Sequence, residues 1–443
     1  MHAAPPRRTV RSPLGALLVC LVSVAASDAP IDSGIGHGAP WTGLPSKPAL
    51  ACPGRGQGVR MQIGFGSPGE DWINRVLPLR DGTALAVGFL NRASTDDSHA
   101  FAVRLKPDGT IVWAREFGDR GANAFWSARE AADGRLYLAG YTGGAGAGGL
   151  DAFLLILDGA GTTLRQSTFG GAKDDLAFDL ILTADGDAVL AGQTESTGAG
   201  ERDVFLVRTD RDGRERWRRD YGQAGVDRGF GVVESPDGGL VVAGITAPDA
   251  KTPVDGLVMK TDGRGTLRWR RVVAGDKADI PHFLHLLPGG TIQVVGYAAS
   301  WGARDNDLLS IVLAQDGTIL HQEIFGGPGD DRGMTSALDR DGHSLLVGYT
   351  QSAGAGDWDI VLARLSPSGA FESMVTCGTA GVDRGTSVAP LPDGTLLLGA
   401  YVSGPGTAGL DSLVLRTDRP KWPKRPDGFV AQRQSPAATN APQ

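Results

Sequence analysis

The sequence predicts an all-β fold: a seven-bladed β-propeller of four-stranded antiparallel blades, closed by the N-terminal strand. Three observations support it. The chain repeats itself seven times with a period of about 52 residues. Each repeat contains four short strand patterns joined by turn signals. The first and last repeats are complementary, because the chain opens on the kind of strand that the last repeat lacks.

Several columns of identical residues keep the period. A glycine that closes a short apolar run recurs at a step of 52 residues five times and 51 once, at Gly88, Gly140, Gly192, Gly244, Gly296, Gly348 and Gly399. One aspartate column comprises Asp71, Asp175, Asp227, Asp279, Asp331 and Asp383, with Asn123 in the second repeat. Another comprises Asp151, Asp203, Asp255, Asp307, Asp359 and Asp411, with His99 in the first. An aromatic–glycine pair such as Phe169-Gly170 precedes the first aspartate column in most repeats.

The third repeat illustrates the four strands. Asp185-Gly186 and Asp212-Gly213 separate apolar runs, and an Asp-Gly pair between such runs is a strong hairpin signal because the turn needs positive φ. The repeat region shows no sustained 3.6-residue periodicity, so helices are not expected. The strands are predicted at 177–183, 188–193, 203–209 and 215–221.

The ends of the repeat region predict how the ring closes. The region 58–418 starts with a lone outer strand, 59–65, and ends on 412–417 with no outer strand after it. We expect these two segments to pair antiparallel, which removes the open edge. Residues 28–57 are a Gly/Pro-rich linker, and residues 419–443 are expected to be a disordered Pro-rich tail.

Residues 1–27 have the pattern of a signal peptide. Arg7, Arg8 and Arg11 precede the apolar run Leu14 to Ala26, which is too short for a stable membrane-spanning helix. A short membrane anchor and a lipid attached at Cys20 are the alternatives. We therefore expect an extracytoplasmic address (periplasm, secreted or cell surface) and no transmembrane span in the mature chain.

Charge and cysteine content narrow the partners. The net charge is −7, from 43 basic and 50 acidic residues, and no basic stripe is visible, so nucleic acid is not an expected partner. The mature chain keeps Cys52 and Cys377. Because these fall near opposite ends of strands, and hence near opposite faces, we expect no bridge between them.

The segment Thr168 to Thr197 resembles the repeats of the SBBP and delta-60-type families of bacterial seven-bladed β-propeller proteins. The matching elements are Phe169-Gly170-Gly171, Asp174-Asp175, the Gly186 turn, Ala191-Gly192 with Thr194, and Ser196. The resemblance covers about residues 58–418. It implies a propeller outside the cytoplasm and implies no reaction or catalytic residue.

The aspartate columns begin two strands of each repeat and fall on one face of the disc. Twelve carboxylates there could bind metal or form an acidic ligand surface. A structural role is favoured, since a residue present in nearly every blade serves every blade, and a carboxylate can accept hydrogen bonds from loop amides. A calcium loop would need several oxygens converging in one segment, so no metal and no cofactor are expected.

Departures from the sevenfold pattern are better candidates for a specific site. One column reads Asn74, Trp126, Phe178, Phe230, His282, Met334 and Thr386, and it makes Trp126 and His282 candidate ligand contacts. Arg228, Arg332 and Arg384 recur in Asp-Arg-Gly and could bind a carboxylate or sulfate, unless they pair with neighbouring aspartates. Trp301 and Trp358 lie in loops of the same face.

These features favour a non-catalytic, monomeric propeller whose loop face binds a protein or carbohydrate. The alternative is a propeller-type polysaccharide lyase or glycoside hydrolase with a site at the axial mouth, where His282 and nearby carboxylates would supply acid and base. Propellers host both kinds of function, so the fold does not separate them.

Overall fold

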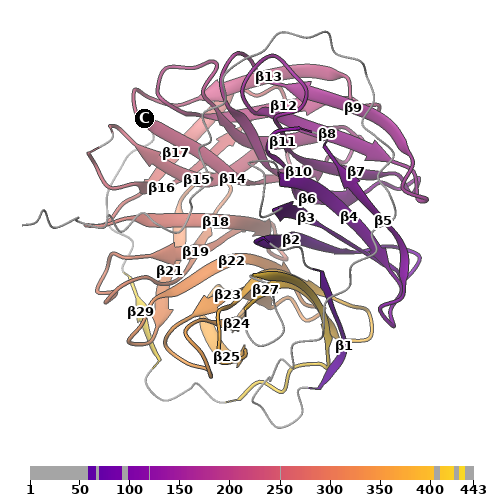
Figure 1. Ribbon diagram of the computed structural model, residues 1–443. Helices are drawn as coiled ribbons and strands as arrows, with labels where there is room; N and C mark the ends of the chain where they lie inside the picture. Colours follow the sequence, from indigo (N-terminus) through magenta and orange to yellow (C-terminus); the bar gives the residue numbers. More distant parts are fainter. Residues whose placement is uncertain are drawn as a thin grey trace, which may run out of the picture. The chain divides into compact units, whose positions relative to one another are not determined.

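The computed structural model describes residues 58–65, 69–91, 98–118, 120–249, 251–403, 410–423 and 429–434. Every regular element in these ranges is a β-strand, and none of the described residues forms a helix long and apolar enough to cross a membrane. The strands form seven antiparallel sheets around a common axis, within the unit Ile35–Gln443 (Figure 1). The predicted all-β, seven-bladed propeller is confirmed.

Each sheet is one blade, and its strands are named A to D from the axis outwards. The A strands of neighbouring blades contact each other all round the ring, which makes them the innermost layer. Blades one to three are β2 (Asp71–Pro78), β3 (Ala84–Asn91), β4 (Ser98–Leu105), β5 (Ile111–Phe117); β6 (Asn123–Glu130), β7 (Leu136–Thr142), β8 (Asp151–Leu157), β9 (Thr163–Phe169); and β10 (Asp175–Leu182), β11 (Ala188–Thr194), β12 (Asp203–Thr209), β13 (Glu215–Tyr221).

Blades four to seven follow the same order. They are β14 (Val226–Glu234), β15 (Leu240–Ala247), β16 (Asp255–Thr261), β17 (Leu267–Val273); β18 (Asp279–Leu286), β19 (Ile292–Ala298), β20 (Asp307–Leu313), β21 (Ile319–Gly326); β22 (Asp331–Leu338), β23 (Ser344–Thr350), β24 (Asp359–Leu365), β25 (Phe371–Cys377); and β26 (Asp383–Pro390), β27 (Leu396–Val402), β28 (Asp411–Thr417), β1 (Val59–Phe65).

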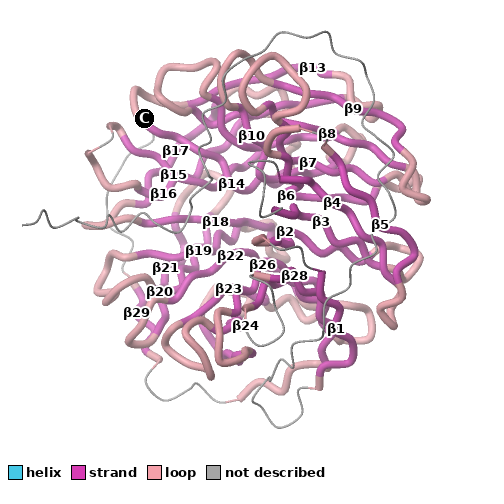
Figure 2. The backbone as a smooth tube through the Cα atoms, in the orientation of Figure 1, coloured by secondary structure: helices cyan, strands magenta, loops and turns pink. Residues whose placement is uncertain are grey.

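The hydrophobic core lies between neighbouring blades. Phe117 of blade one, for example, packs edge-on against the fully buried Phe125 of blade two at 5.4 Å between ring centroids. Similar clusters fill the other blade boundaries. The smooth tube in Figure 2 shows the strands of each blade stacked side by side, with loops confined to their ends. Each blade therefore buries its apolar faces only when both neighbours are present.

A β-bulge in every A strand explains the repeating glycine. The register between strands A and B shifts by one residue, and in blade one this brings the carbonyl oxygen of Trp72 close to Gly88, where a Cβ would lie only 1.8 Å away. The next five blades show the same close approach. In blade seven the equivalent position is Ala400, which pairs with Gly385. Gly399 was thus assigned to the column one residue early, and this accounts for the single step of 51.

The seventh blade closes with the N-terminal strand, as the phase of the repeats predicted. Strand β1 pairs antiparallel with β28, with Phe65 opposite Ser412 and Ile63 opposite Val414. Phe65 is fully buried and joins a core cluster that reaches into blade one. The ends of the ring are therefore joined by a hydrogen-bonded strand pair as well as by side-chain packing.

The expectation of disorder across 419–443 is wrong for the parts that the structure describes. Strand β29 (Val430–Arg433) pairs with the outer strand β21 and gives blade five a fifth strand (Figure 1). Phe429 is buried in a core cluster, and the hydroxyl of Ser373 in blade six donates to the carbonyl of Pro423. The proline-rich composition of this segment predicted disorder. Its two aromatic residues, and the free edge of the outer strand β21 with which it pairs, favour an ordered structure instead.

Cys377 is disulfide-bonded. The chain has three cysteines, and the other two, Cys20 and Cys52, lie outside the described residues. The expectation that Cys52 and Cys377 do not pair with each other therefore stays a prediction.

The closure pairing should be essential to the fold. We expect deletion of residues 28–57 to leave the propeller intact, because it removes no strand of the ring. Deletion of residues 28–66 removes β1 and should lower the melting temperature sharply or cause aggregation, since β28 becomes an open edge. Circular dichroism melts under reducing conditions compare the two without any bridge to Cys377. Identical melting of both truncations would contradict the closure role.

Candidate binding face

The two faces of the disc differ in their connections. The loop face carries the connections from strand D to the next strand A and from B to C. The turn face carries the tight A–B and C–D turns, in which glycines such as Gly82 and Gly186 have φ near +85° (84° and 86°). The aspartate columns stand at the starts of strands A and C and therefore on the loop face.

The aspartates bind the loops of their own blades. Asp331, which is fully buried, accepts hydrogen bonds from the backbone N–H of Gly327 at 2.9 Å and from the hydroxyl of Ser352 at 2.7 Å. Asp359 accepts from the backbone N–H groups of Ala355 and Gly356, both at 3.0 Å. These carboxylates accept hydrogen bonds from loop amide groups that have no partner within the glycine-rich loop itself. Among the described residues, no group of three or more His, Cys, Asp or Glu is placed to hold a metal ion.

The two columns also meet across blade boundaries. A Cβ on Gly170 would lie 2.2 Å from an oxygen of Asp151 in blade two and 2.6 Å from an oxygen of Asp175 in blade three. Gly222, Gly326 and Gly378 are held between carboxylates in the same way. This contact explains the glycine that follows the aromatic residue in the repeat. At the boundary between blades one and two, His99 and Asn123 replace both carboxylates together.

Buried carboxylates at these boundaries hold their protons tightly. Burial is the main cause that raises the pKa of Asp279 and Asp307 to about 7, and the partner carboxylate across the boundary contributes to each rise. Burial likewise raises the pKa of Asp151 and Asp383 to about 6. At these boundaries two carboxylates therefore meet, and one of them is favoured in its neutral form.

The bulged residues of the A strands fill the axis. Phe178 lies between Trp126 and Phe230, at centroid distances of 5.4 and 5.6 Å. His282 stacks on Phe230 at 5.2 Å, and its Nδ1 lies 2.9 Å from the carbonyl oxygen of Met334. Burial, with Arg75 nearby, lowers the pKa of His282 to about 4. These contacts hold Trp126 and His282 in axial packing, with no carboxylate arranged beside the imidazole.

A charged network lies beneath this aromatic layer. Arg75 of blade one donates to Asp179 of blade three at 3.0 Å, and Ser127 of blade two donates to the same carboxylate at 2.8 Å. The backbone N–H of Val232 in blade four donates to it at 3.2 Å. Asp179 is 1% exposed. Hydrogen bonds to Asp179 thus connect four blades across the axial channel. Because these side chains cross the channel, a ligand of the loop face would lie over its mouth.

The three arginines of the Asp-Arg-Gly motif differ in their partners. Arg332 makes a bidentate ion pair with Asp330, at 2.9 and 2.7 Å. Arg228 and Arg384 make no ion pair with the described residues, and the Nε of each is buried without an acceptor. Burial, with Arg202 nearby, lowers the pKa of Arg228 to about 10. Of the three arginines, only Arg332 therefore forms an ion pair with the described residues. Its partner is Asp330 and not the aspartate of the repeat column.

Arg332 and Arg384 belong to an arc of aromatic rings on the loop face, which we call the mouth arc: Tyr297, Arg332, Tyr349, Trp358, Arg384, Tyr401, Trp72 and Phe89. The indole of Trp358 contacts the ring of Tyr349 edge-on at 5.0 Å and lies beneath both guanidinium groups. Trp72 stacks on Tyr401 at 4.6 Å and on Phe89 at 5.7 Å. The arc spans blades five, six, seven and one, whereas the equivalent positions of blades two to four include the apolar Leu176 and Ile245.

Sequence reasoning found only part of this arc. Trp358 and two arginines were among the candidates, but Trp72, Phe89 and three tyrosines were not. In strand B, each tyrosine directly follows the residue that lies opposite the bulge of strand A. The recurrence of tyrosine at this position in blades five to seven could have been read from the sequence. Trp301 does not join the arc. It has a positive φ of 58°, packs against a core cluster of blades four and five, and its carbonyl accepts from Gln434 of the C-terminal segment.

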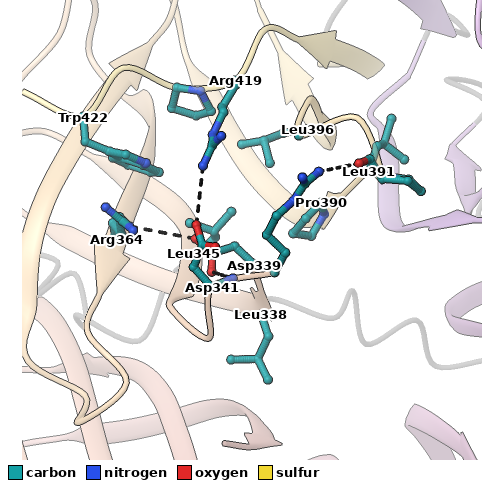
Figure 3. A pocket seen from close by; sticks show the side chains of 14 residues that line it. Leu338, Asp339, Asp341, Leu345, Arg364, Pro390, Leu391, Leu396, Arg419 and Trp422 are labelled. Atoms are coloured by element: carbon teal, nitrogen blue, oxygen red, sulfur yellow. Dashed lines mark hydrogen bonds and ion pairs between the residues drawn. The ribbon is translucent and has the colours of Figure 1, made fainter. Parts of the chain in front are cut away.

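A cavity of about 430 Å³ opens on the turn face, between blades six and seven. Its apolar wall includes Leu338, Leu345 and Leu396, and Arg364 lies over the indole of Trp422 at 5.9 Å (Figure 3). Arg419 pairs with Asp341 at its rim at 3.4 Å. None of the residues singled out from the sequence lines it.

No protein-family model matches the chain, and no curated protein matches it. Solved structures share its fold. The polysaccharide lyase Uly1 has a TM-score of 0.51 at 10% identity, over 79% of this chain and 90% of that one. The arabinofuranosidase Arb93A of Fusarium graminearum has a TM-score of 0.47 at 11% identity, over 82% and 98%. Sqt1 of Chaetomium thermophilum has a TM-score of 0.44 at 13% identity, over 81% and 87%.

At these identities the likeness concerns the fold alone, and TM-scores below 0.5 add nothing to it. The seven-bladed propeller thus has structural support, and the SBBP resemblance remains an expectation.

Asp203 tests the structural role of the columns. Its replacement by Ala should destabilise the propeller by about 1–3 kcal/mol, because the N–H of Gly200, which it accepts at 3.0 Å, loses its partner. Chemical denaturation measures the change. A chelator should not reproduce it, and a large fall in melting temperature with EDTA would contradict this role by revealing a metal.

The raised carboxyl pKa values predict a pH dependence. The folded state binds the protons of Asp279 and Asp307 more tightly than the unfolded chain does, since their folded pKa is about 7. Their contribution to stability is therefore present at low pH and lost as pH rises towards 7. His282 acts oppositely, because its lowered pKa of about 4 destabilises the fold below pH 6.5.

We accordingly expect a higher melting temperature near pH 6 than near pH 8. Asp279→Asn copies the residue that blade two carries naturally as Asn123 and should flatten this difference. A melting temperature that is unchanged between the two pH values in the native chain would overturn the assignment.

Proposed function

We propose that this protein is a monomeric, non-catalytic propeller that acts outside the cytoplasm and binds a protein or carbohydrate with its loop face. The single observation that carries the proposal is the mouth arc. It brings aromatic rings and two arginines from four blades together on the loop face, where the three tyrosines are buried and the other rings are partly exposed, and the other blades do not repeat it. A ligand rarely has sevenfold symmetry, so a surface that breaks the symmetry is the natural binding site.

Rigid aromatic rings and arginine suit such a surface. Both supply large contact area with little loss of side-chain freedom on binding, and both are enriched where proteins bind partners. Trp72, Phe89 and Trp358 keep part of their surface exposed. The extracytoplasmic address rests on the signal-peptide pattern of residues 1–27, which lie outside the described residues, and on the SBBP resemblance.

The enzymatic alternative has no comparable observation in its favour. An acid–base mechanism at the mouth would need His282 near a carboxylate in one accessible pocket. His282 instead stacks on Phe230 and faces the carbonyl of Met334. Its lowered pKa of about 4 would leave it neutral at physiological pH.

A glycan array and a pull-down with the mature chain test the proposal. Trp358→Ala removes the central ring of the mouth arc and should abolish capture of whatever binds. Trp422→Ala, which removes an indole from the turn-face cavity, is the matched control and should leave capture unchanged. Binding that is lost only with Trp422→Ala would place the site on the opposite face and overturn the proposal.

A further inference from the structure

Arg384 is surrounded by aromatic rings on the loop face. It is the second residue of β26, and its guanidinium carbon lies 4.9 Å from the ring centroid of Tyr349, 5.1 Å from that of Trp358 and 5.8 Å from that of Tyr401. Ring faces attract a cation and also orient its planar guanidinium group. The arginine is therefore held in place with its charge close to the mouth.

That charge has no carboxylate partner among the described residues. The only hydrogen bond that the guanidinium donates to a described residue is from Nη1 to the hydroxyl of Tyr401, at 3.3 Å. Its Nε is buried without an acceptor. Glu70 is near enough to Tyr401 to influence its pKa, yet makes no ion pair with Arg384. Most of the five N–H donors of this arginine thus remain available.

The preceding blade shows what would normally occupy these donors. Arg332 has the same place one repeat earlier and lies over Tyr297 and Trp358, at 5.3 and 5.8 Å. Its guanidinium group donates two hydrogen bonds to the carboxylate of Asp330. The position equivalent to Asp330 in blade seven is Val382. Blade seven therefore keeps the arginine and its rings and lacks the internal carboxylate.

We propose that Arg384 binds the carboxylate of an acidic sugar, a uronic acid, whose ring lies against the exposed parts of Trp72 and Phe89. This rests on the proposed function and names its ligand class. The carboxylate accepts hydrogen bonds from the two terminal nitrogens of the guanidinium group in a charge-assisted pair, because Nε is buried. The partly exposed Trp72 and Phe89 present apolar surface to the C–H groups of the sugar.

The surroundings favour a sugar over an extended peptide. A peptide usually gains its affinity by adding to a free strand edge, and the described part of the mouth presents the partly exposed Trp72 and Phe89 and loop ends instead. The axial residues close the channel beneath, so the ligand lies across the mouth. Arg228 offers no such site, because Gln193, Arg202 and Ile245 stand at the positions equivalent to Tyr349, Trp358 and Tyr401 around Arg384.

Calorimetric titration of the mature chain with trigalacturonate tests the proposal. The uncharged galactotriose, a sulfated trisaccharide and triglutamate are the comparison probes. We expect trigalacturonate to bind and galactotriose not to bind. Arg384→Ala should weaken binding at least about tenfold, as expected for loss of a charged hydrogen-bonded pair.

Val382→Asp is the decisive variant, because it supplies the carboxylate that blade six has and should block the site while keeping every ring. Arg219→Ala is the matched control, since Arg219 also lies over an indole, that of Trp217 at 6.0 Å, but on the outer strand of blade three. It should bind normally. Unchanged melting temperatures establish that each variant is folded.

Absence of trigalacturonate binding, or binding that survives Val382→Asp, overturns the inference. So does preferential binding of the sulfated sugar or of triglutamate. If the array or pull-down still finds a ligand that depends on Trp358, the proposed function stands while the uronate assignment fails. If capture depends on the turn face, both fail.

Discussion

The ring depends on one strand pair, β1 with β28. Every other blade takes its strands A to D from one continuous stretch of chain, whereas the seventh takes its strand D from the opposite end of the repeat region. The seventh blade joins the two ends of the repeat region by backbone hydrogen bonds, and the N–H of Asp71 then donates to the carbonyl of Leu410 at 2.8 Å. Only a closed ring fixes seven A strands around one axis. The axial packing, the Arg75–Asp179 network and the mouth arc all follow from that arrangement.

Closure by an N-terminal strand also explains the cavity on the turn face. In blades three and four a cation near the end of strand C reaches the next C–D turn: Arg208 donates to the carbonyl of Gly263 at 2.9 Å, and Lys260 to Gln315 at 2.8 Å. Blade seven has no C–D turn, since its strand D comes from the other end of the chain. Arg364 of blade six faces Trp422 instead, and the space left there is the cavity.

The repeat columns predicted blade number, strand order and closure because turn chemistry and a fixed period are local properties of the sequence. What escaped prediction depends on contacts between distant segments. The glycine of blade seven was misassigned because the bulge register, which selects Ala400, is visible only in the strand pairing. Strand β29 likewise depends on the path of the C-terminal segment. Similarly, the sequence alone left open which of the three arginines would be paired.

Repetition and its interruption have different physical consequences in this fold. Where both columns keep aspartate, two carboxylates meet at a blade boundary, and burial favours the neutral form of one of them. Such contacts serve every blade alike and cannot specify a ligand. Asp330 and Val382 occupy the same position in successive blades, yet one neutralises an arginine and the other does not. A single carboxylate omitted from an otherwise repeated environment leaves a charge at one place on the ring. Specificity can therefore arise on a symmetric scaffold by loss of an internal partner, without any new loop.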